Sequence, residues 1–494
     1  MTPSFETVIG LEVHVQLATA TKLFCSCPTD YIGSEPNTLV CPVCLGLPGT
    51  LPSLNGRSVE LGVKTALALG CSISRTSRFH RKNYFYPDLP KAFQISQYDL
   101  PVATGGSMPV FVGGEKKFIG ITRLHLEEDA GKLVHGTADG RLSGRSFSNV
   151  DYNRAGIPLA EIVSEPDMRS PEEAREYVLT LRRLVRYLGV SDGDMESGSL
   201  RVDANISQKC SDGRWGGRVE IKNVNSVRAM ERALDFEITR QRGIMLSGGT
   251  VVQETRHWDD SAGVTRSSRG KEEAHDYRYF PEPDLPPLIV NDALVRAMGE
   301  SLPELPWVKR ERFETEWGLS PEDAAVLSER LDLAEFLEST VASGAGRDIA
   351  ANWIKTEILR ILNETGLDAG DLPFTPRVLG ELLGEVVKGS LSNTAARDVL
   401  EVMYRKGLGI QDAMKETGVV PGGVTGDLLA KAVRRVLDAN REETGLVLSG
   451  ADPSGKKRKY LQGLVMREIR GQAPVGDVSA VIDEALRQMR GLDE

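Results

Sequence analysis

The sequence lacks the motifs with which most nucleotide-binding proteins hold phosphate groups. It contains no G-x-x-x-x-G-K-[ST] loop, no G-x-G-x-x-G turn and no kinase-type H-R-D triplet. The run from Gly189 to Gly193 matches G-x-S-x-G, but a nucleophile elbow follows a strand, whereas this run closes a predicted helix. We therefore interpret it as a helix C-cap and turn. The serine–serine–lysine arrangement of an amidase is also missing, so the sequence does not indicate a chain that releases its own nitrogen donor.

Long apolar runs and targeting segments are missing as well. No stretch approaches the roughly 18 apolar residues of a membrane helix. The first residues show neither the basic and apolar regions of a signal peptide nor the composition of a transit peptide, so we expect a cytoplasmic protein. The net charge of −10 argues against a protein that coats nucleic acid with a basic surface. Local basic patches stay possible, and Lys456–Lys459 is either such a patch or an ordinary loop.

The chain of 494 residues is too long for one hydrophobic core, and its length favours roughly two to four domains. Prolines cluster from Pro281 to Pro287 and recur at Pro303 and Pro306, which is typical of a domain boundary. Before the cluster the sequence is rich in strand patterns, and after it the pattern is almost entirely helical. We predict an α+β fold, with a strand-rich antiparallel domain at residues 1–290 and an all-α tail divided into 291–400 and 401–494.

Local signals mark a few elements clearly. Ser170 as N-cap and Pro171 at the first helical position open a helix that Gly189 closes, and a second helix is predicted from Ser226 to Gly243. The sequence Ser320-Pro321-Glu322-Asp323 opens a later helix in the same way.

Two alternating runs predict an antiparallel hairpin with one polar face. They cover Leu200–Ile206 and Val219–Ile221 and are separated by the glycine-rich turn Ser211–Gly217.

Acidic residues and a histidine occupy one face of two predicted strands. Apolar residues alternate with Glu12 and His14 in the run Leu11–Leu17, so these two side chains project from the same face. Alternation around Leu124 and Leu126 likewise places Arg123, His125 and Glu127 on one face, after which Glu128–Lys132 is predicted to form a loop. Together with Glu161, this set suits Mg²⁺, which binds carboxylate and phosphate oxygens. The alternative for any single pair is a solvated strand face.

Four of the six cysteines form two closely spaced pairs. Cys25-x-Cys27 and Cys41-x-x-Cys44 fit two tight turns that hold one tetrahedral zinc ion better than they fit disulfides in a chain without a secretion signal. A closed Cys₄ site leaves no open coordination position, so its role would be structural. Free buried thiols are the alternative.

Five segments of the sequence, in order, resemble the GatB subunit of the glutamyl/aspartyl-tRNA amidotransferases. They are Val8–His14, Arg81–Asp88, Leu124–Lys132, Gly156–Asp167 and Asp276–Asp284. The tail is similar at Asn352-Trp353 and from Ser454 to Met466 to the helical and YqeY-like tail domains of that family. The sequence departs from the family pattern at Ala473-Pro474-Val475 and at Ser197, where the family usually has glutamate.

The resemblance implies an ATP-dependent reaction in a strand-rich catalytic (cradle) domain. ATP would phosphorylate the side-chain carboxylate of glutamate or aspartate mischarged onto tRNA(Gln) or tRNA(Asn), and ammonia would then displace the phosphate. The implied partners in a heterotrimer are an amidase (glutaminase) subunit, which supplies the ammonia, and a small third subunit. The helical tail with its YqeY-like end would bind the tRNA.

The resemblance also implies residue roles. The implied ligands of Mg²⁺ and ATP are Glu12, His14, Glu127, Glu128 and Glu161, with Asp129 as a supporting member. Arg201 and Lys222 would neutralise phosphate charge or form an ordinary salt-bridge ladder on the hairpin. Lys82 and Lys91 would line an ammonia channel or lie on the surface as ordinary lysines.

Two rival hypotheses belong to other classes of protein. A non-catalytic scaffold that docks tRNA would need only the cysteine turns and the helical tail, and would have no use for clustered carboxylates. A self-sufficient metallohydrolase would need the His/His/Glu-type ligand spacing of catalytic zinc, which the sequence lacks. ATP hydrolysis that depends on mischarged tRNA distinguishes the proposed enzyme from both.

Overall fold

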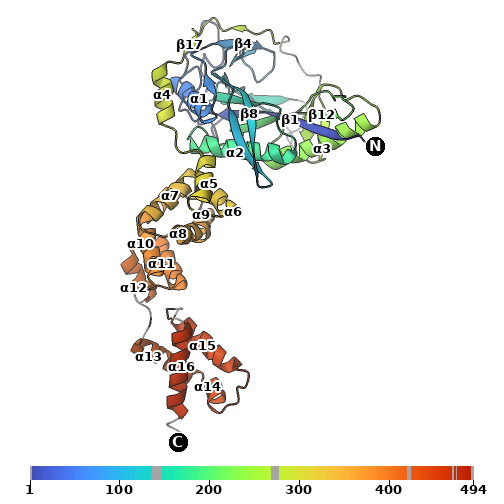
Figure 1. Cartoon of the computed structure of the whole chain (residues 1–494). Coiled ribbons are helices and arrows are strands. Elements are labelled where there is room, and N and C mark those ends of the chain that lie inside the picture. Colours follow the sequence, from blue (N-terminus) through green and yellow to red (C-terminus); the bar gives the residue numbers. More distant parts are fainter. Residues whose placement is uncertain are drawn as a thin grey trace. The chain divides into compact units, whose positions relative to one another are not determined.

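The structure, a computed structural model, describes residues 3–135, 147–268, 277–419, 424, 426–469, 472–473 and 475–490. The chain forms two compact units, Met1–Trp307 and Val308–Glu494. Within the described residues the first unit carries the strands and the second is helical (Figure 1), which confirms the predicted α+β class. The first unit extends past the proline cluster to Trp307, and the finer division at 290 and 400 stays a prediction. Asp276 and Pro474 lie outside the described residues.

The strands all lie in the first unit among the described residues. They are β1 (Phe5–Gln16), β2 (Ser72–Ile73), β3 (Thr76–Ser77), β4 (Phe79–Asn83), β5 (Phe93–Gln97), β6 (Ala103–Thr104), β7 (Ser107–Val112), β8 (Glu115–Glu128), β9 (Lys132–His135), β10 (Ser148–Asp151), β11 (Pro158–Ser164), β12 (Leu200–Cys210), β13 (Val219–Lys222), β14 (Glu254–Asp259), β15 (Val264–Ser267), β16 (Phe280–Pro281) and β17 (Leu288–Ile289).

Helices α1–α3 lie between strands of the first unit, α4 follows its last strand, and the later helices form the second unit. The helices are α1 (Gly56–Ala68), α2 (Pro171–Tyr187), α3 (Val227–Leu246), α4 (Asp292–Glu300), α5 (Pro306–Thr315), α6 (Pro321–Leu327), α7 (Leu331–Ala342), α8 (Arg347–Trp353), η1 (Ile354–Ile358), α9 (Leu359–Thr365), η2 (Ala369–Asp371), α10 (Pro376–Val387), α11 (Asn393–Lys406), α12 (Ile410–Thr417), α13 (Gly426–Ala439), α14 (Arg441–Leu448), α15 (Lys456–Glu468) and α16 (Val475–Arg490).

One large sheet organises the first unit, with the strand order β15-β14-β13-β12-β1-β11-β8-β5-β4-β16. Its pairs are antiparallel, as predicted, except that β13 and β14 run parallel. The exception has a clear cause, because α3 connects β13 to β14 and a helical crossover returns the chain in the same direction. The predicted hairpin of β12 and β13 is confirmed.

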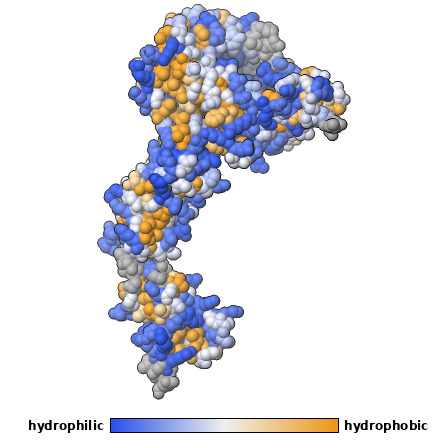
Figure 2. All heavy atoms as spheres, in the orientation of Figure 1, coloured by the Kyte–Doolittle hydropathy of each residue, from blue (hydrophilic) through white to orange (hydrophobic). Residues whose placement is uncertain are grey.

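The two faces of the sheet differ in chemistry. On β1, Leu11, Val13 and Val15 are buried in a core that also contains the apolar faces of α1, α2 and α3, which cover this side of the sheet (Figure 1). Glu12 and His14 alternate with them and face the other side, so the uncovered face carries the polar residues. In the view of Figure 2, apolar residues gather mainly on the side of the first unit that carries α1 and α4.

The predicted helix starts are confirmed, and two boundaries differ. The Ser170 side chain accepts a hydrogen bond from the Glu173 N–H at the start of α2, and Ser320 caps α6 in the same way. Helix α3 begins after Ser226 as predicted but continues past Gly243 to Leu246. The prediction that Glu128 lies in a loop is wrong: Glu128 belongs to β8, because it still pairs with Pro158 of β11.

The described part of the second unit contains two apolar clusters, one formed by α5–α12 and one by α13–α16. Lys456–Lys459 does not form a loop but the first turn of α15. Arg458 within it binds Asp483 of α16, whereas Lys456 and Lys459 project from the same turn. None of the described helices combines the length and apolar character needed to cross a membrane.

Candidate active site and metal centre

A row of polar residues crosses the uncovered face of the sheet. In the strand register, His14 of β1 lies opposite Glu161 of β11, and Glu161 lies opposite His125 of β8. Glu127 lies two residues further along β8 on the same face, and Ser96 of β5 faces it. Four neighbouring strands therefore bring together residues that are separated by up to about 150 positions in the sequence.

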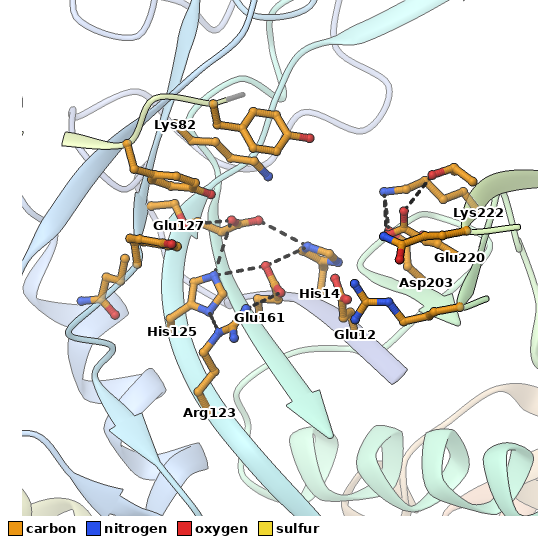
Figure 3. Close-up of a pocket in the computed structure, with 18 of the residues that line it drawn as sticks. Glu12, His14, Lys82, Arg123, His125, Glu127, Glu161, Asp203, Glu220 and Lys222 are labelled. Atoms are coloured by element: carbon orange, nitrogen blue, oxygen red, sulfur yellow. Dashed lines mark hydrogen bonds and ion pairs between the residues drawn. The ribbon is translucent and has the colours of Figure 1, made fainter. Parts of the chain in front are cut away.

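These side chains form a compact cluster (Figure 3). His14 Nε2 lies 3.4 Å from Glu161 Oε2 and 3.5 Å from Glu127 Oε1. His125 Nε2 lies 3.1 Å from Glu161 Oε2, and the Ser96 hydroxyl donates a hydrogen bond of 3.2 Å to Glu127. One ligand atom from each of His14, Glu127 and Glu161 falls within 4.8 Å of the others, a spacing that can hold a metal ion.

The cluster keeps its carboxylates ionised although they are buried. Burial alone would raise the pKa of Glu161, but the imidazoles of His125 and His14 outweigh it and hold that pKa well below its usual range. Burial alone would lower the pKa of His125, but attraction to Glu161 and Glu127 raises it to about 9. Two buried carboxylates are balanced by the positive charge of two protonated imidazoles. A bound cation can replace this positive charge when the imidazoles lose their protons.

The cluster lies in a cavity of about 760 Å³ with a mainly polar lining. Glu12 lines the cavity and accepts a hydrogen bond of 2.9 Å from the Asn205 side chain. On one side, Lys222 lies 3.1 Å from Asp203 and 3.6 Å from Glu220 (Figure 3). The same cavity is lined on another side by Lys82 and a group of tyrosines. Its size and charge suit a phosphorylated ligand with a divalent cation.

Buried Asp129 and partly exposed Arg201 form a separate ion pair beside the cluster. Arg201 Nη2 lies 2.8 Å from Asp129 Oδ2, and the Gln16 side chain donates a hydrogen bond of 3.2 Å to the same oxygen. Arg154 approaches Asp129 to 3.5 Å. Neither Asp129 nor Arg201 lines the cavity that holds His14, although Arg201 of β12 lies opposite His14 in the strand register.

The structure does not bring Glu128 to the cluster. Because Glu128 follows Glu127 in the same strand, its side chain points to the opposite face. There it forms an ion pair with Lys91 and accepts a hydrogen bond of 2.9 Å from the Ile95 N–H. Glu128 and Lys91 line a second pocket of about 210 Å³, which also borders Cys25 and Cys44.

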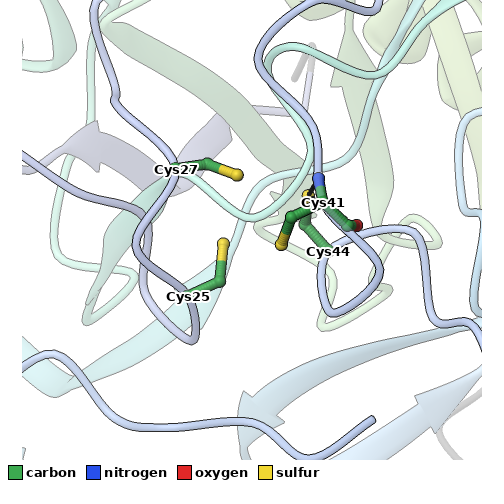
Figure 4. Close-up of side chains that lie close together, drawn as sticks. All are labelled: Cys25, Cys27, Cys41 and Cys44. Atoms are coloured by element: carbon green, nitrogen blue, oxygen red, sulfur yellow. Dashed lines mark hydrogen bonds between the residues drawn. The ribbon is translucent and has the colours of Figure 1, made fainter.

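The four predicted cysteines converge as one group (Figure 4). Each of Cys25, Cys27, Cys41 and Cys44 offers a sulfur atom within 4.8 Å of the others. Four thiolates around zinc, with Zn–S bonds of about 2.3 Å, lie about 3.8 Å apart, so the group fits such an ion without rearrangement of the fold. A hydrogen bond from Cys25 is the main cause that lowers the pKa of the Cys44 thiol to about 5, and the positive charge of Lys22 contributes.

Several residues of the site were missed at the level of the sequence. His125 lies on the polar face predicted for this strand but is absent from the set of ligands that the resemblance implies, although period-two alternation with Glu127 is sufficient to include it. Asp203 and Glu220 were likewise visible on the polar face of the hairpin. No sequence pattern identifies Tyr98 and Tyr279, because their rings stack only when distant parts of the chain come together in the fold.

The fold and the site together define a class of protein, namely a strand-rich domain with a carboxylate–imidazole cluster spaced to hold a cation, followed by a helical tail. The family model described as the GatB/GatE catalytic domain matches residues 7–296, and the model described as the GatB domain matches residues 335–486. The chain belongs to the GatB family.

Full-length relatives support this assignment. A protein of Moorella thermoacetica, named as the B subunit of aspartyl/glutamyl-tRNA(Asn/Gln) amidotransferase, is 49% identical over 98% of this chain and 100% of its own length. Proteins with the same name from Carboxydothermus hydrogenoformans and Caldanaerobacter subterraneus subsp. tengcongensis are 46% and 47% identical. The matches cover 98% and 95% of this chain, and 99% and 96% of those proteins.

Proposed function

We propose that this chain is the component of a tRNA-dependent amidotransferase that converts the side-chain carboxylate of Glu-tRNA(Gln), Asp-tRNA(Asn) or both into an amide. The observation that carries the proposal is the cluster of His14, Glu127 and Glu161 in a polar cavity large enough for a nucleotide. The names of the full-length relatives support the substrate class. The chain acts with an amidase (glutaminase) subunit and with a small third subunit.

The reaction consists of two balanced steps. A side-chain carboxylate oxygen of the tRNA-bound amino acid attacks the γ-phosphorus of ATP, and ADP leaves. Ammonia then attacks the carbonyl carbon of the acyl phosphate, loses a proton and expels inorganic phosphate, so that an amide remains. Activation is needed because a carboxylate oxygen is a poor leaving group, and phosphoryl transfer depends mainly on positioning and on charge stabilisation.

Glu127, Glu161 and His14 would hold Mg²⁺, with Glu12 beside them. When bound, the ion supplies charge neutralisation for the phosphate oxygens. Lys222 can contribute further positive charge from its side of the cavity. Burial alone would lower the pKa of Lys222, but the carboxylates of Asp203 and Glu220 outweigh it, raise the pKa and keep the ammonium protonated. Asp129 and Arg201 would stabilise the strands beside the site.

In this proposal Glu128 does not bind magnesium but contacts the ammonia. Its ion pair with Lys91 lies in the second pocket, on the face of β8 opposite to the one that carries Glu127. Ammonia from the amidase subunit would pass this pair, whereas Lys82 would meet ammonia in the main cavity.

The cysteine cluster would hold a structural zinc ion. Four thiols would fill the tetrahedral coordination sphere of the ion. Because no position would stay open for substrate, the ion would have a structural role.

Substitution of single carboxylates tests the proposed reaction. In the reconstituted complex, Glu127→Gln and Glu161→Gln keep the side-chain volume but remove the charge that binds the cation. Each should lower ADP release that depends on mischarged tRNA by about 100-fold or more, a loss typical of a removed charge-stabilising group. Glutamine hydrolysis by the partner should remain competent.

The exposed Glu300→Gln in α4 serves as the matched control and should behave like the wild type. Near-normal amidation in both cluster variants would refute the assignment of the site. A wild-type complex whose ATP hydrolysis does not respond to mischarged tRNA would instead support a docking scaffold.

A further inference from the structure

One wall of the main cavity consists of tyrosine rings that the proposed phosphoryl transfer does not use. The rings of Tyr98 and Tyr279 stack with centroids 4.3 Å apart and planes at 10°. Tyr277 packs edge-on against Tyr279 at 6.1 Å. All three line the cavity, and Tyr98 remains 49% exposed. A half-exposed aromatic ring held by a second ring inside a polar cavity is a surface on which a planar base can stack.

This aromatic wall lies close to the carboxylate cluster. Tyr98 comes two residues after Ser96, whose hydroxyl donates a hydrogen bond to Glu127. Two residues of extended chain span about 7 Å. If a ligand stacks its base on Tyr98 and carries a short flexible extension, that extension can therefore reach the carboxylate cluster.

Another side of the cavity carries Lys222 and Arg218, with Asp203 and Glu220 beside them. Figure 3 shows Lys82 and Lys222 on different sides of the cluster formed by His14, Glu127 and Glu161. Lys82 marks the aromatic wall, because its Nζ lies 4.9 Å from the centroid of the Tyr277 ring. Phosphoryl transfer places donor and acceptor roughly in line on opposite sides of the transferred group. If the triphosphate lies toward Lys222, the acceptor carboxylate must approach from the aromatic wall.

We propose that the stack of Tyr98 and Tyr279 is the platform for the purine base at the 3′ end of the aminoacyl-tRNA. This inference rests on the proposed function and adds the place where the acceptor enters. The terminal adenosine carries the amino acid on its ribose, so stacking of its base on Tyr98 directs the side-chain carboxylate toward Glu127 and Glu161. The adenine of ATP has the same chemistry, and the test must separate the two sources.

Binding can be tested without catalysis. A tRNA whose terminal adenosine is replaced by the fluorescent base 2-aminopurine is titrated with the assembled complex. The wild type and Tyr98→Phe should quench the fluorescence by stacking, whereas Tyr98→Leu, which has an apolar side chain without a ring, should not. Phe118→Ala removes an exposed aromatic residue of β8 outside the cavity lining and should leave the quenching unchanged.

Steady-state kinetics identify the source of the base. Tyr98→Leu should raise the KM for mischarged tRNA about tenfold or more, within the range for loss of one stacked base, and leave the KM for ATP unchanged. A selective rise in the KM for ATP would overturn the proposal in favour of the ATP adenine. Unchanged values for both substrates, or quenching by Tyr98→Leu equal to that of the wild type, would also overturn it. Loss of tRNA-dependent ATP turnover already in the wild type would count against the proposed function alone, because the quenching experiment does not depend on turnover.

Discussion

A single buried lysine offsets part of the charge of the cysteine cluster. Lys22 has no exposed surface, which is rare for a lysine and requires partners for its ammonium group. Its Nζ donates a hydrogen bond of 2.9 Å to the Leu39 carbonyl and one of 3.4 Å to the Tyr152 carbonyl, and it lies 3.8 Å from Cys44 Sγ. Lys22 therefore places a positive charge next to thiols that carry negative charge when they bind metal.

The hydrogen bond from Cys25 and the charge of Lys22 predict how the metal-free cluster titrates. Because the pKa of Cys44 is lowered to about 5 in the folded protein, its thiolate should form as the pH rises through about 5, well below the usual thiol value of about 8.5. The ultraviolet absorbance of the thiolate, followed during a pH titration of metal-stripped protein, should show this step. Cys44→Ser should remove the step and Lys22→Met should move it to higher pH. A titration without a thiolate below pH 7 would contradict the account.

At the scale of elements, the turn that carries Cys41 and Cys44 also supports the second pocket. Gly46 ends this turn with a φ of +65°, and a Cβ at this position would collide with the side chain of Lys91 and lie 3.2 Å from its Cα. The cysteine turn therefore packs directly against the lysine that pairs with Glu128.

A pair of glycine substitutions isolates this contact. Gly46→Ala should destabilise the protein by about 1–3 kcal/mol more than Gly49→Ala, the cost typical of overpacking, because Gly49 also has a positive φ but no neighbour within 4 Å of its Cβ position. Denaturant unfolding of the two variants measures the difference. Gly46→Ala should also reduce glutamine-dependent amidation more than amidation with added ammonium. Equal behaviour of the two variants would show that the turn does not position Lys91.

Local periodicity predicted much of the site, because the strands alternate strictly. It placed Glu12, His14 and Glu127 on the face that the structure leaves uncovered. It did not place Glu128, because the predicted strand ends at Glu127, one residue before the end of β8. As part of the strand, Glu128 points to the face opposite to that of Glu127. The parallel pairing of β13 and β14 was missed because the sequence does not reveal which strand a helical connection returns to. The aromatic wall depends on contacts between segments about 180 residues apart, which no local pattern records.

At the scale of the whole molecule, the proposed chemistry, including the site for the 3′ end of the tRNA, falls in the first unit, and the proposed binding of the tRNA body falls in the second. The candidate magnesium ligands all lie at or before Glu161, in the first unit. Truncation after Pro287 would remove partly buried residues of β17 and α4 from the core of that unit, so the structure places the better truncation point after Trp307.

Deletion of the second unit should weaken tRNA binding but not ATP binding. We expect the KM for mischarged tRNA to rise about tenfold or more, which corresponds to about 1.4 kcal/mol or more of binding energy. The full-length complex should lose tRNA affinity steeply with added salt, because phosphate contacts to basic residues such as Lys456 and Lys459 release counterions. Binding titrations of ATP and of tRNA to both forms provide the measurement. Unchanged tRNA affinity after deletion would assign the tail to assembly or stability.

The central claim is that the side-chain carboxylate becomes an acyl phosphate before it becomes an amide. Mischarged tRNA carrying glutamate labelled with ¹⁸O in both side-chain oxygens tests this directly. During amidation by the reconstituted complex, the account predicts that one labelled oxygen appears in each molecule of inorganic phosphate, and that Glu127→Gln abolishes this transfer. Amide formation with phosphate that contains no label would contradict the account.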